Sequence, residues 1–300
     1  MSTNTTSEPT ELFGASSQQP RSLFRDAWRR LLSSWNGRVG LFLITVTMLI
    51  GLLAPIVNPY DPTIDSNLAE SRFPPSLDHP FGTDRLGRDI FQRVVHGTRV
   101  SLLIGFVVVF VSGIIGTLLG LIAGYFGSFY DTIVMRFMDI LLAFPAILLA
   151  IAIVAVRGPG LGNTILAVAI VGIPGYARVV RSIVLSVRER DFIEAARATG
   201  VRNQRIMFLH ILPNSLSPII VQVTLGVGGA ILFAAALGFL GLGVQPPVPE
   251  WGAMISDGIP FLRQSPHMVF FPGIAIMLTV LGFNLLGDGL RDALDPQLRE

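Results

Sequence analysis

Six stretches of the chain are long, apolar and almost free of charge. A helix that crosses the hydrocarbon core of a membrane needs about 20 predominantly apolar residues. The third stretch is interrupted only by Asp139 near its start, and one such charge costs about 3 kcal/mol against a gain of roughly 10 kcal/mol for a full apolar span. We therefore predict an all-α membrane protein with six transmembrane helices, over residues 39–57, 101–130, 137–156, 158–177, 215–240 and 268–287.

The segment before the first span has the pattern of a helix with one apolar face. Arg25, Arg29 and Arg30 lie on the other face. This pattern is typical of an amphipathic helix in the membrane interface, and a loose linker is the alternative. Residues 1–20 are polar and are expected to form a disordered cytoplasmic tail. The apolar side chains of the predicted helix, residues 21–36, are Leu23, Phe24, Ala27, Trp28, Leu31, Leu32 and Trp35.

The positions of the arginines predict how the chain is oriented. All 22 basic residues are arginine, and six spans place both termini on one side of the membrane. With a cytoplasmic N-terminus, fifteen arginines lie inside and seven outside, as the positive-inside rule requires. We therefore expect an N-in, C-in protein with a first span at 37–57, an extracytoplasmic loop at 58–99, five further spans within 100–290 and a cytoplasmic tail at 291–300.

Two residue types are absent, and each absence removes a class of chemistry. Without lysine the chain has no G-x-x-x-x-G-K-[ST] phosphate loop, so it does not hydrolyse ATP by that route. Without cysteine it has no disulfide, thiolate nucleophile or zinc–thiolate site. The span centres also lack the ionisable residues that proton-coupled carriers use. Energy for active transport must therefore come from another subunit.

No metal site is expected either, because no ligand spacing such as H-x-x-x-H occurs among His79, His96, His210 and His267.

Small residues line one face of the second predicted span. Gly116, Gly120 and Gly124 are four residues apart, a spacing that lets helix backbones approach closely in lipid. Glycines and alanines between residues 226 and 236 indicate a similarly close-packed fifth span. Proline can kink a helix, and three prolines lie within the predicted spans: Pro145, Pro174 and Pro272.

The longest inner loop, residues 183–214, has the pattern of two short helices. Asp191 suits the start of the first helix and Gly200 its end, because glycine readily takes the left-handed conformation that stops a helix. The second helix is predicted over residues 203–212, with its boundary at Pro213. A docking surface and a solvated loop both fit this pattern. One side of the first helix carries Phe192, Ala195, Ala196 and Thr199.

This loop resembles the EAA loop of ABC importer permeases. Glu194-Ala195-Ala196 is followed by Gly200 and later by the ending Ile211-Leu212-Pro213. His210 stands where the family usually has isoleucine, and the ending is similar to that of the peptide-transporter branch. The resemblance implies a coupling helix that docks into a cleft of a separate ATPase subunit. The residues that it implies for this coupling are Phe192, Glu194, Ala195, Ala196, Gly200, Leu212 and Pro213.

Three further segments resemble the second, C-type permease subunit of the dipeptide/oligopeptide/nickel ABC importer family. They are residues 79–89 and 241–252 in the outer loops and residues 287–296 near the C-terminus. With the EAA loop, the similarity covers roughly residues 22–300. It implies the type I ABC importer permease fold. It also implies a non-catalytic, multi-pass subunit of the cell membrane that moves dipeptides or oligopeptides into the cytoplasm.

The resemblance also implies partners. These are a second, homologous permease subunit, two ATPase subunits and an extracytoplasmic substrate-binding protein, all at the membrane and without nucleic acid. No cofactor is expected on this chain, because ATP and Mg²⁺ would bind the ATPase subunits. Import of nickel or another small solute is the alternative within the family. A passive channel or a membrane scaffold is the alternative outside it.

Four charged residues of the first outer loop are candidate contacts for the binding protein. The alternative interpretation is that they pair with one another at the membrane surface. They are Asp84, Arg85, Arg88 and Asp89. No substrate-lining residue is assigned. The substrate cavity is expected to be mostly apolar, with backbone and hydroxyl contacts, because uncharged spans supply little else.

Overall fold

The computed structural model describes residues 23–57, 59–61 and 66–294, so the predicted tail 1–20 lies outside the described residues. Within these ranges the chain is helical, with one isolated antiparallel bridge between Thr83 and Asp89 and no strand. The helices are α1 (Leu23–Ser33), α2 (Trp35–Val57), α3 (Ile90–Phe126), α4 (Ser128–Ala143), α5 (Ala146–Arg157), α6 (Leu161–Arg188), α7 (Asp191–Ala198), α8 (Asn203–Arg205), α9 (Leu212–Phe239), α10 (Trp251–Gly258) and α11 (His267–Leu294), with 3₁₀ turns η1 (Leu68–Glu70) and η3 (Ile259–Phe261) and a π-helix η2 (Ile206–Ile211).

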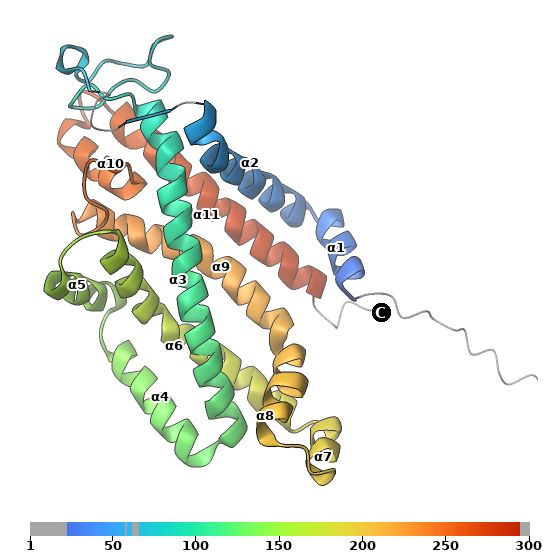
Figure 1. The fold of residues 1–300 in the computed structure, drawn as a ribbon. Coiled ribbons are helices and arrows are strands. Elements are labelled where there is room, and N and C mark those ends of the chain that lie inside the picture. Colours follow the sequence, from blue (N-terminus) through green and yellow to red (C-terminus); the bar gives the residue numbers. More distant parts are fainter. Residues whose placement is uncertain (1–22, 58, 62–65, 295–300) are drawn as a thin grey trace, which may run out of the picture.

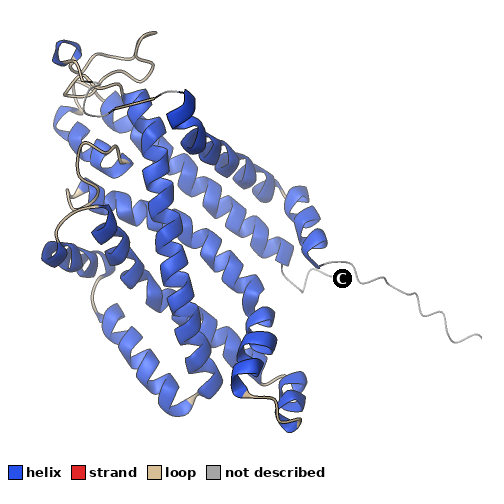
Figure 2. Ribbon diagram, in the orientation of Figure 1, coloured by secondary structure: helices blue, strands red, loops and turns tan. Residues whose placement is uncertain are grey.

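Helix α3 forms the axis of the bundle, and α6 and α9 pack against it (Figure 1). α11 packs against α9 on one side and α2 on the other. Figure 2 shows helices throughout the body of the molecule, joined by loops gathered mainly at its ends. Five helices are long and apolar enough to cross a membrane, and the pair α4–α5 is a sixth candidate if it counts as one bent span. The prediction of an all-α membrane protein is confirmed.

The third predicted span is not one continuous helix. α4 and α5 are separated by Phe144 and Pro145, and their axes differ in direction by 87°. A proline disfavours the helical conformation of the residue before it, and Phe144 is indeed extended, with φ −91° and ψ 137°. The span predicted over residues 137–156 is therefore divided into two helices at Pro145, one of the three prolines named as able to kink a span. Pro174 and Pro272, in contrast, lie inside α6 and α11 without ending either helix.

Two helices extend into segments predicted as loop or tail. α3 begins at Ile90, so the last ten residues of the predicted outer loop 58–99 are helical. In the sequence, the charged residues Arg93 and Arg99 suggest a loop. In the structure, Arg93 is buried and paired with Asp84. α11 continues to Leu294, so the first four residues of the predicted tail 291–300 are helical as well.

A helix, α1, lies within the segment 21–36 and ends at Ser33, so that it meets α2 at Ser34; its position in the membrane interface stays a prediction. Leu31 is buried, whereas Trp28 and Trp35 are exposed. A Cβ on Gly289 of α11 would lie 2.7 Å from the Gly37 Cα, so α11 nearly touches the α1–α2 junction. This contact holds α1 at the C-terminal end of α11 and leaves Trp28 on the surface of the bundle.

Three glycines of α3 let α6 approach closely. A Cβ on Gly116 would lie 2.5 Å from the Tyr176 Cβ, and one on Gly120 would lie 2.5 Å from the Ala177 carbonyl oxygen. Gly124 makes an equally close approach one turn further on. The predicted small-residue face is confirmed as a packing contact, which we call the α3–α6 seam.

We expect Gly120→Ala to lower the free energy of unfolding by about 1–3 kcal/mol, because overpacked side chains displace their neighbours. The new Cβ would collide with the α6 backbone, which cannot rotate away as a flexible side chain does. Thermal unfolding in detergent measures the change. Gly273→Ala is the matched control, because a Cβ at this span glycine meets nothing within 4 Å. Equal melting temperatures for the two variants would contradict the importance of the seam.

Candidate functional site

A short helix, α7, projects from one end of the bundle beyond α3 and α6 (Figure 1). It follows α6 after Glu189 and Arg190 and returns to the bundle through α8. Asp191 lies in its first turn rather than at its N-cap, where Arg190 stands without a side-chain capping bond. The acidic side chains of Asp191 and Glu194 favour this end of the helix, since its backbone N–H groups carry partial positive charge.

The two faces of α7 differ in what they contact. Ile193 is fully buried, in a cluster with α3, α6, η2 and α9 side chains such as Val187 and Ile206. Phe192, Glu194 and Ala195 are exposed. α7 is thus fixed to the bundle on one face and open on the other.

The residues predicted to share one apolar side of α7 differ in their exposure. Phe192, Ala195 and Thr199 are exposed, but Ala196 is half-buried and packs against the Ile193 cluster. Leu212 packs against the same cluster, whereas Pro213 is exposed. Ala196 and Leu212 therefore support the helix from behind. The sequence signal for this face is the spacing of Ile193 and Ala196, three residues apart, which we did not use in the prediction.

Polar contacts attach the α7–α8 turn to the end of α3. The Tyr125 hydroxyl donates to Asn203 Oδ1 at 2.8 Å, and the Arg197 guanidinium lies 5.4 Å from the Tyr125 ring centroid. A cation above an aromatic face is attracted by the ring, which adds to the hydrogen bond. Tyr125 thereby holds both sides of the turn.

Gly200 ends α7 as predicted. Its φ of +76° is in the left-handed region that favours glycine. The Val201 N–H donates to the Ala196 carbonyl at 3.1 Å, and the Gly200 N–H donates to the Arg197 carbonyl at 2.9 Å. These bonds satisfy carbonyls at the end of the helix that would otherwise lack donors.

The predicted helix boundary at Pro213 is wrong. α8, the π-helix η2 and α9 follow one another without a break, and Pro213 lies in the first turn of α9. Proline lacks an N–H and crowds the carbonyl four residues earlier, and the wider π turn directly before it relieves that conflict. The segment after α7 therefore runs straight into a membrane span.

At the opposite end of the bundle, the Asp84 carboxylate organises the first outer loop. Its Oδ1 accepts the backbone N–H groups of Leu86 at 2.8 Å and Arg88 at 3.0 Å. Its Oδ2 accepts Nε of Arg88 at 2.7 Å and pairs with Arg93. Asp84, Arg88 and Arg93 are all buried. This carboxylate joins the loop to the start of α3.

The four predicted binding-protein contacts come together in this loop, but they differ in accessibility. Asp84 and Arg88 are buried and paired, and Asp89 caps α3 by accepting the Gln92 N–H at 3.0 Å. The Arg85 side chain is 45% exposed and lies 3.5 Å from Asp257 of the α10 helix. Of these four residues, Arg85 has the most exposed side chain.

Helix α10 closes the same end of the bundle. Burial raises the pKa of the Glu250 carboxyl, although its bonds to the Gly252 and Ala253 N–H groups, at 2.8 and 2.9 Å, act in the opposite direction. The buried Trp251 indole donates to the Val94 carbonyl at 3.0 Å. The Glu250-Trp251-Gly252 segment thus docks α10 onto α3.

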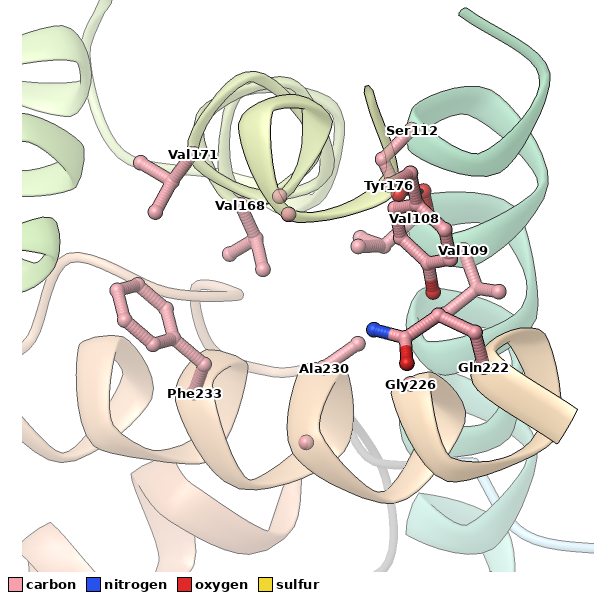
Figure 3. Close-up of a pocket in the computed structure, with 13 residues that line it drawn as sticks. Val108, Val109, Ser112, Val168, Val171, Tyr176, Gln222, Gly226, Ala230 and Phe233 are labelled. Atoms are coloured by element: carbon pink, nitrogen blue, oxygen red, sulfur yellow. Dashed lines mark hydrogen bonds between the residues drawn. The ribbon is translucent and has the colours of Figure 1, made fainter. Parts of the chain in front are cut away.

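A cavity of about 210 Å³ lies between α3, α6 and α9 (Figure 3). Its walls are mostly valine, alanine and glycine. Polar groups enter it from three helices: Ser112 of α3, Tyr176 of α6 and Gln222 of α9. No sequence pattern singled out these three residues, because they are far apart along the chain and only the packing brings them together.

Comparison with known proteins identifies the family. Residues 116–300 match the family described as "Binding-protein-dependent transport system inner membrane component". The chain belongs to this family. Residues 22–75 also match the "N-terminal TM domain of oligopeptide transport permease C". The permease is therefore a non-catalytic, multi-pass component of an ABC importer in the inner membrane.

Relatives resemble the permease over nearly its whole length. The dipeptide transport system permease protein DppC of Alkalihalophilus pseudofirmus is 55% identical, over 93% of this chain and 91% of the relative. The glutathione transport system permease protein GsiD of Pectobacterium atrosepticum is 47% identical, over 93% of each chain. The di/tripeptide transport system permease protein DppC of Pseudomonas aeruginosa is 46% identical, again over 93% of each.

A solved structure shows the same fold. The inward-facing MetNI methionine ABC transporter has a chain that matches with a TM-score of 0.56 and 21% identity. The match covers 68% of this permease and 96% of that chain. The type I importer permease fold is thus confirmed.

We expect Asp84→Ala to lower the free energy of unfolding of the permease by about 3–5 kcal/mol, because it leaves the buried Arg93 without its counter-charge and Arg88 with only Asp257, at 3.8 Å. Arg85→Ala is the control, since an exposed ion pair contributes about 0–1 kcal/mol. Thermal unfolding in detergent compares them. Equal losses for the two variants would show that the buried Asp84 network is not what holds the outer loop.

His79 predicts a pH dependence of stability. Its Nδ1 lies 2.8 Å from Asp89 Oδ2 and its Nε2 lies 3.2 Å from Glu70 Oε2. The hydrogen bond to Asp89, with the charges of both acids, raises the pKa of His79 above its ordinary value. Because the folded state binds this proton more tightly, the stabilisation is fully present below the unfolded pKa of roughly 6.5. It is lost as the pH rises through the higher folded-state pKa.

The melting temperature should therefore fall as the pH rises from about 6 through that range. His79→Gln should remove this part of the pH dependence, because glutamine has no titrating group. An identical pH profile for the variant and the native permease would contradict the role of His79.

Proposed function

We propose that the permease forms one half of a pore that imports short peptides, and that α7 couples this pore to an ATPase subunit. Relatives along the whole chain are named for transport of dipeptides, di/tripeptides or glutathione, all of which are short peptides. A second permease subunit forms the other half of the pore. An extracytoplasmic binding protein delivers the peptide.

The exposed face of α7 is the observation that supports coupling most directly. It presents Phe192 and Glu194 beside the small Ala195, so a cleft of the partner can accommodate the phenyl ring and close over Ala195 without steric conflict. The opposite face is anchored through Ile193. A force applied to Phe192 or Ala195 by a partner is therefore passed to the bundle instead of bending a loop.

The face that carries α7 is the cytoplasmic one in this proposal. His267 Nε2 lies 3.3 Å from the Thr83 carbonyl oxygen, so α11 and α3 start at the same end of the bundle. The ends of both helices, together with α1 and α7, then lie at the opposite end. Seven arginines lie within residues 178–205, which the positive-inside rule places in the cytoplasm.

The mechanism follows from how α7 is connected. ATP binding closes the ATPase dimer and displaces the coupling helices of both permease subunits. Because α7 leads from α6 and continues through α8 and η2 into α9, its displacement tilts two spans together. The change opens the pore outward for the binding protein, and hydrolysis restores the inward state. ATP thereby shifts the population between two states that bind it differently.

The outer surface meets the binding protein. Arg85 and the Asp257 carboxylate, which is 25% exposed, are two of the charged groups at this surface, and Arg72 and Arg263 are exposed nearby. The buried Asp84 and Arg88 keep this surface in place rather than contact the partner. Peptide selection then depends largely on the binding protein.

We expect Ala195→Glu to abolish peptide uptake while membrane insertion persists, because the position is exposed and a charged side chain overfills the cleft. Ala195→Ser, which stays small, is the control. The assay is ATP-dependent uptake of radiolabelled dialanine by proteoliposomes that hold the whole complex and its binding protein. Uptake of Ni²⁺ but not of dialanine by the native complex would contradict the proposed substrate class.

Gly200 supplies a second test of coupling. Gly200→Val should abolish uptake in the same vesicles, because a β-branched residue is strained at a φ of +76°. Gly200→Asn should retain most of it, since asparagine tolerates the left-handed region. Full uptake by Gly200→Val would overturn the coupling role of the α7 turn.

A further inference from the structure

The cavity between α3, α6 and α9 contains a hydroxyl group whose hydrogen bonding is incomplete. The Tyr176 side chain is buried, and its oxygen has no hydrogen bond of good geometry among the described residues; the neighbouring polar group is the Ser112 hydroxyl, which already donates elsewhere. Buried polar groups are nearly always hydrogen-bonded, because leaving one unpaired is unfavourable. A phenylalanine would fill the same space without that disadvantage. The Tyr176 hydroxyl therefore points to a partner that enters the cavity.

Helix α9 is shaped around this hydroxyl. A Cβ on Gly226 would lie 2.0 Å from the Tyr176 oxygen, so only glycine leaves room for it. Gln222, one turn earlier on α9, turns its amide toward the same space (Figure 3). The Ser112 hydroxyl lies beside Tyr176 (Figure 3) and donates to the Val108 carbonyl at 2.7 Å, which leaves its oxygen able to accept. Three polar groups from three helices converge on one apolar space.

Bare backbone forms much of the remaining wall. A Cβ on Gly175 of α6 or Gly229 of α9 would meet no atom within 4 Å. Packing does not require glycine at either position, because nothing opposes a side chain there. Glycine at both positions keeps the cavity open and lets a bound molecule approach the backbone closely.

The lining decides the chemistry of the occupant. None of the described residues that line the cavity is charged, and none is histidine, aspartate or glutamate. A free carboxylate, an ammonium group or a divalent cation would lack a counter-charge or ligands here. A peptide group has one donor and one acceptor, which the Gln222 amide and the Tyr176 hydroxyl can match. The valine and phenylalanine walls suit an apolar side chain.

We propose that this cavity is a transit site for one uncharged side chain of a peptide, whose neighbouring amide group Tyr176 and Gln222 hold. Its volume of about 210 Å³ lies below the roughly 300–1,000 Å³ of pockets that enclose a whole ligand. The rest of the peptide, including its charged ends, lies outside the cavity toward the partner subunit. This inference rests on the proposed function of peptide import.

The first test fills the cavity. Proteoliposomes with the whole complex, its binding protein and internal ATP are given radiolabelled diglycine or diphenylalanine. Gly229→Leu is expected to lower diphenylalanine uptake at least about tenfold more than diglycine uptake, because the added side chain takes the room of the larger residue. Gly273→Leu, at a span glycine with equally open surroundings but outside the cavity, is the control and should treat the two peptides alike.

The second test removes single polar groups and does not depend on the first variant folding. Tyr176→Phe deletes one oxygen and keeps the ring, and Gln222→Leu keeps most of the side-chain volume. Each should lower uptake of both peptides about fivefold, the effect of one neutral hydrogen bond. Stimulation of ATP hydrolysis by the loaded binding protein should stay unchanged, since neither residue touches α7.

The outcomes separate the two proposals. If native vesicles take up neither peptide, the proposed function is wrong. If native vesicles transport both peptides and all three cavity variants do so at native rates with native selectivity, peptide import stands and the transit site is overturned. Loss of uptake with a parallel loss of stimulated hydrolysis would also overturn it, because the residues would then act on coupling.

Discussion

The close approach of α3 and α6 is the contact on which the rest of the structure depends. In lipid, the hydrophobic effect does not drive helices together, so association relies on van der Waals packing between close backbones. The seam at Gly116 and Gly120 supplies that packing. Gly116 packs against Tyr176, which lines the cavity, and α6 continues from the seam toward α7. One contact thus positions both the cavity wall and the coupling helix.

Most of the segments that resemble a known permease subunit form contacts that connect the ends of helices. The outer segment folds around Asp84, and the Glu250 carboxylate caps α10 against α3. Gly287 packs against Leu225 of α9, where its Cβ would lie 2.4 Å from Leu225 Cδ2. These residues fix the ends of the spans relative to one another. The α7 segment differs because part of it is left exposed.

The sequence predicted the spans well, because an uncharged stretch of sufficient length has few alternatives to a membrane. It predicted the α4–α5 break poorly, since a proline within an apolar stretch either bends a helix, as at Pro145, or is absorbed, as at Pro174. It misplaced the start of α3, because pairing with Asp84 makes a buried Arg93 acceptable. The position of a charged residue in the sequence does not show which residue it pairs with or whether it is buried.

The candidate site was predictable only where it is local. The turn at Gly200 and the exposed Ala195 follow from neighbouring residues, and both agree with the structure. The anchor at Ile193 depends on η2 and α9, and the cavity depends on three helices that meet in space. Residues assembled from distant segments leave no pattern that a single sequence reveals.

The central claim is that the exposed face of α7 contacts an ATPase subunit, while the buried face of α7 packs against the bundle. The chain contains no cysteine, so Ala195→Cys introduces a single thiol. In membranes that contain the whole complex, a short thiol-to-amine cross-linker should join residue 195 to an ATPase subunit, and Ile193→Cys should give no such product. Free alkylation of residue 195 with no cross-link to any ATPase subunit would contradict the claim.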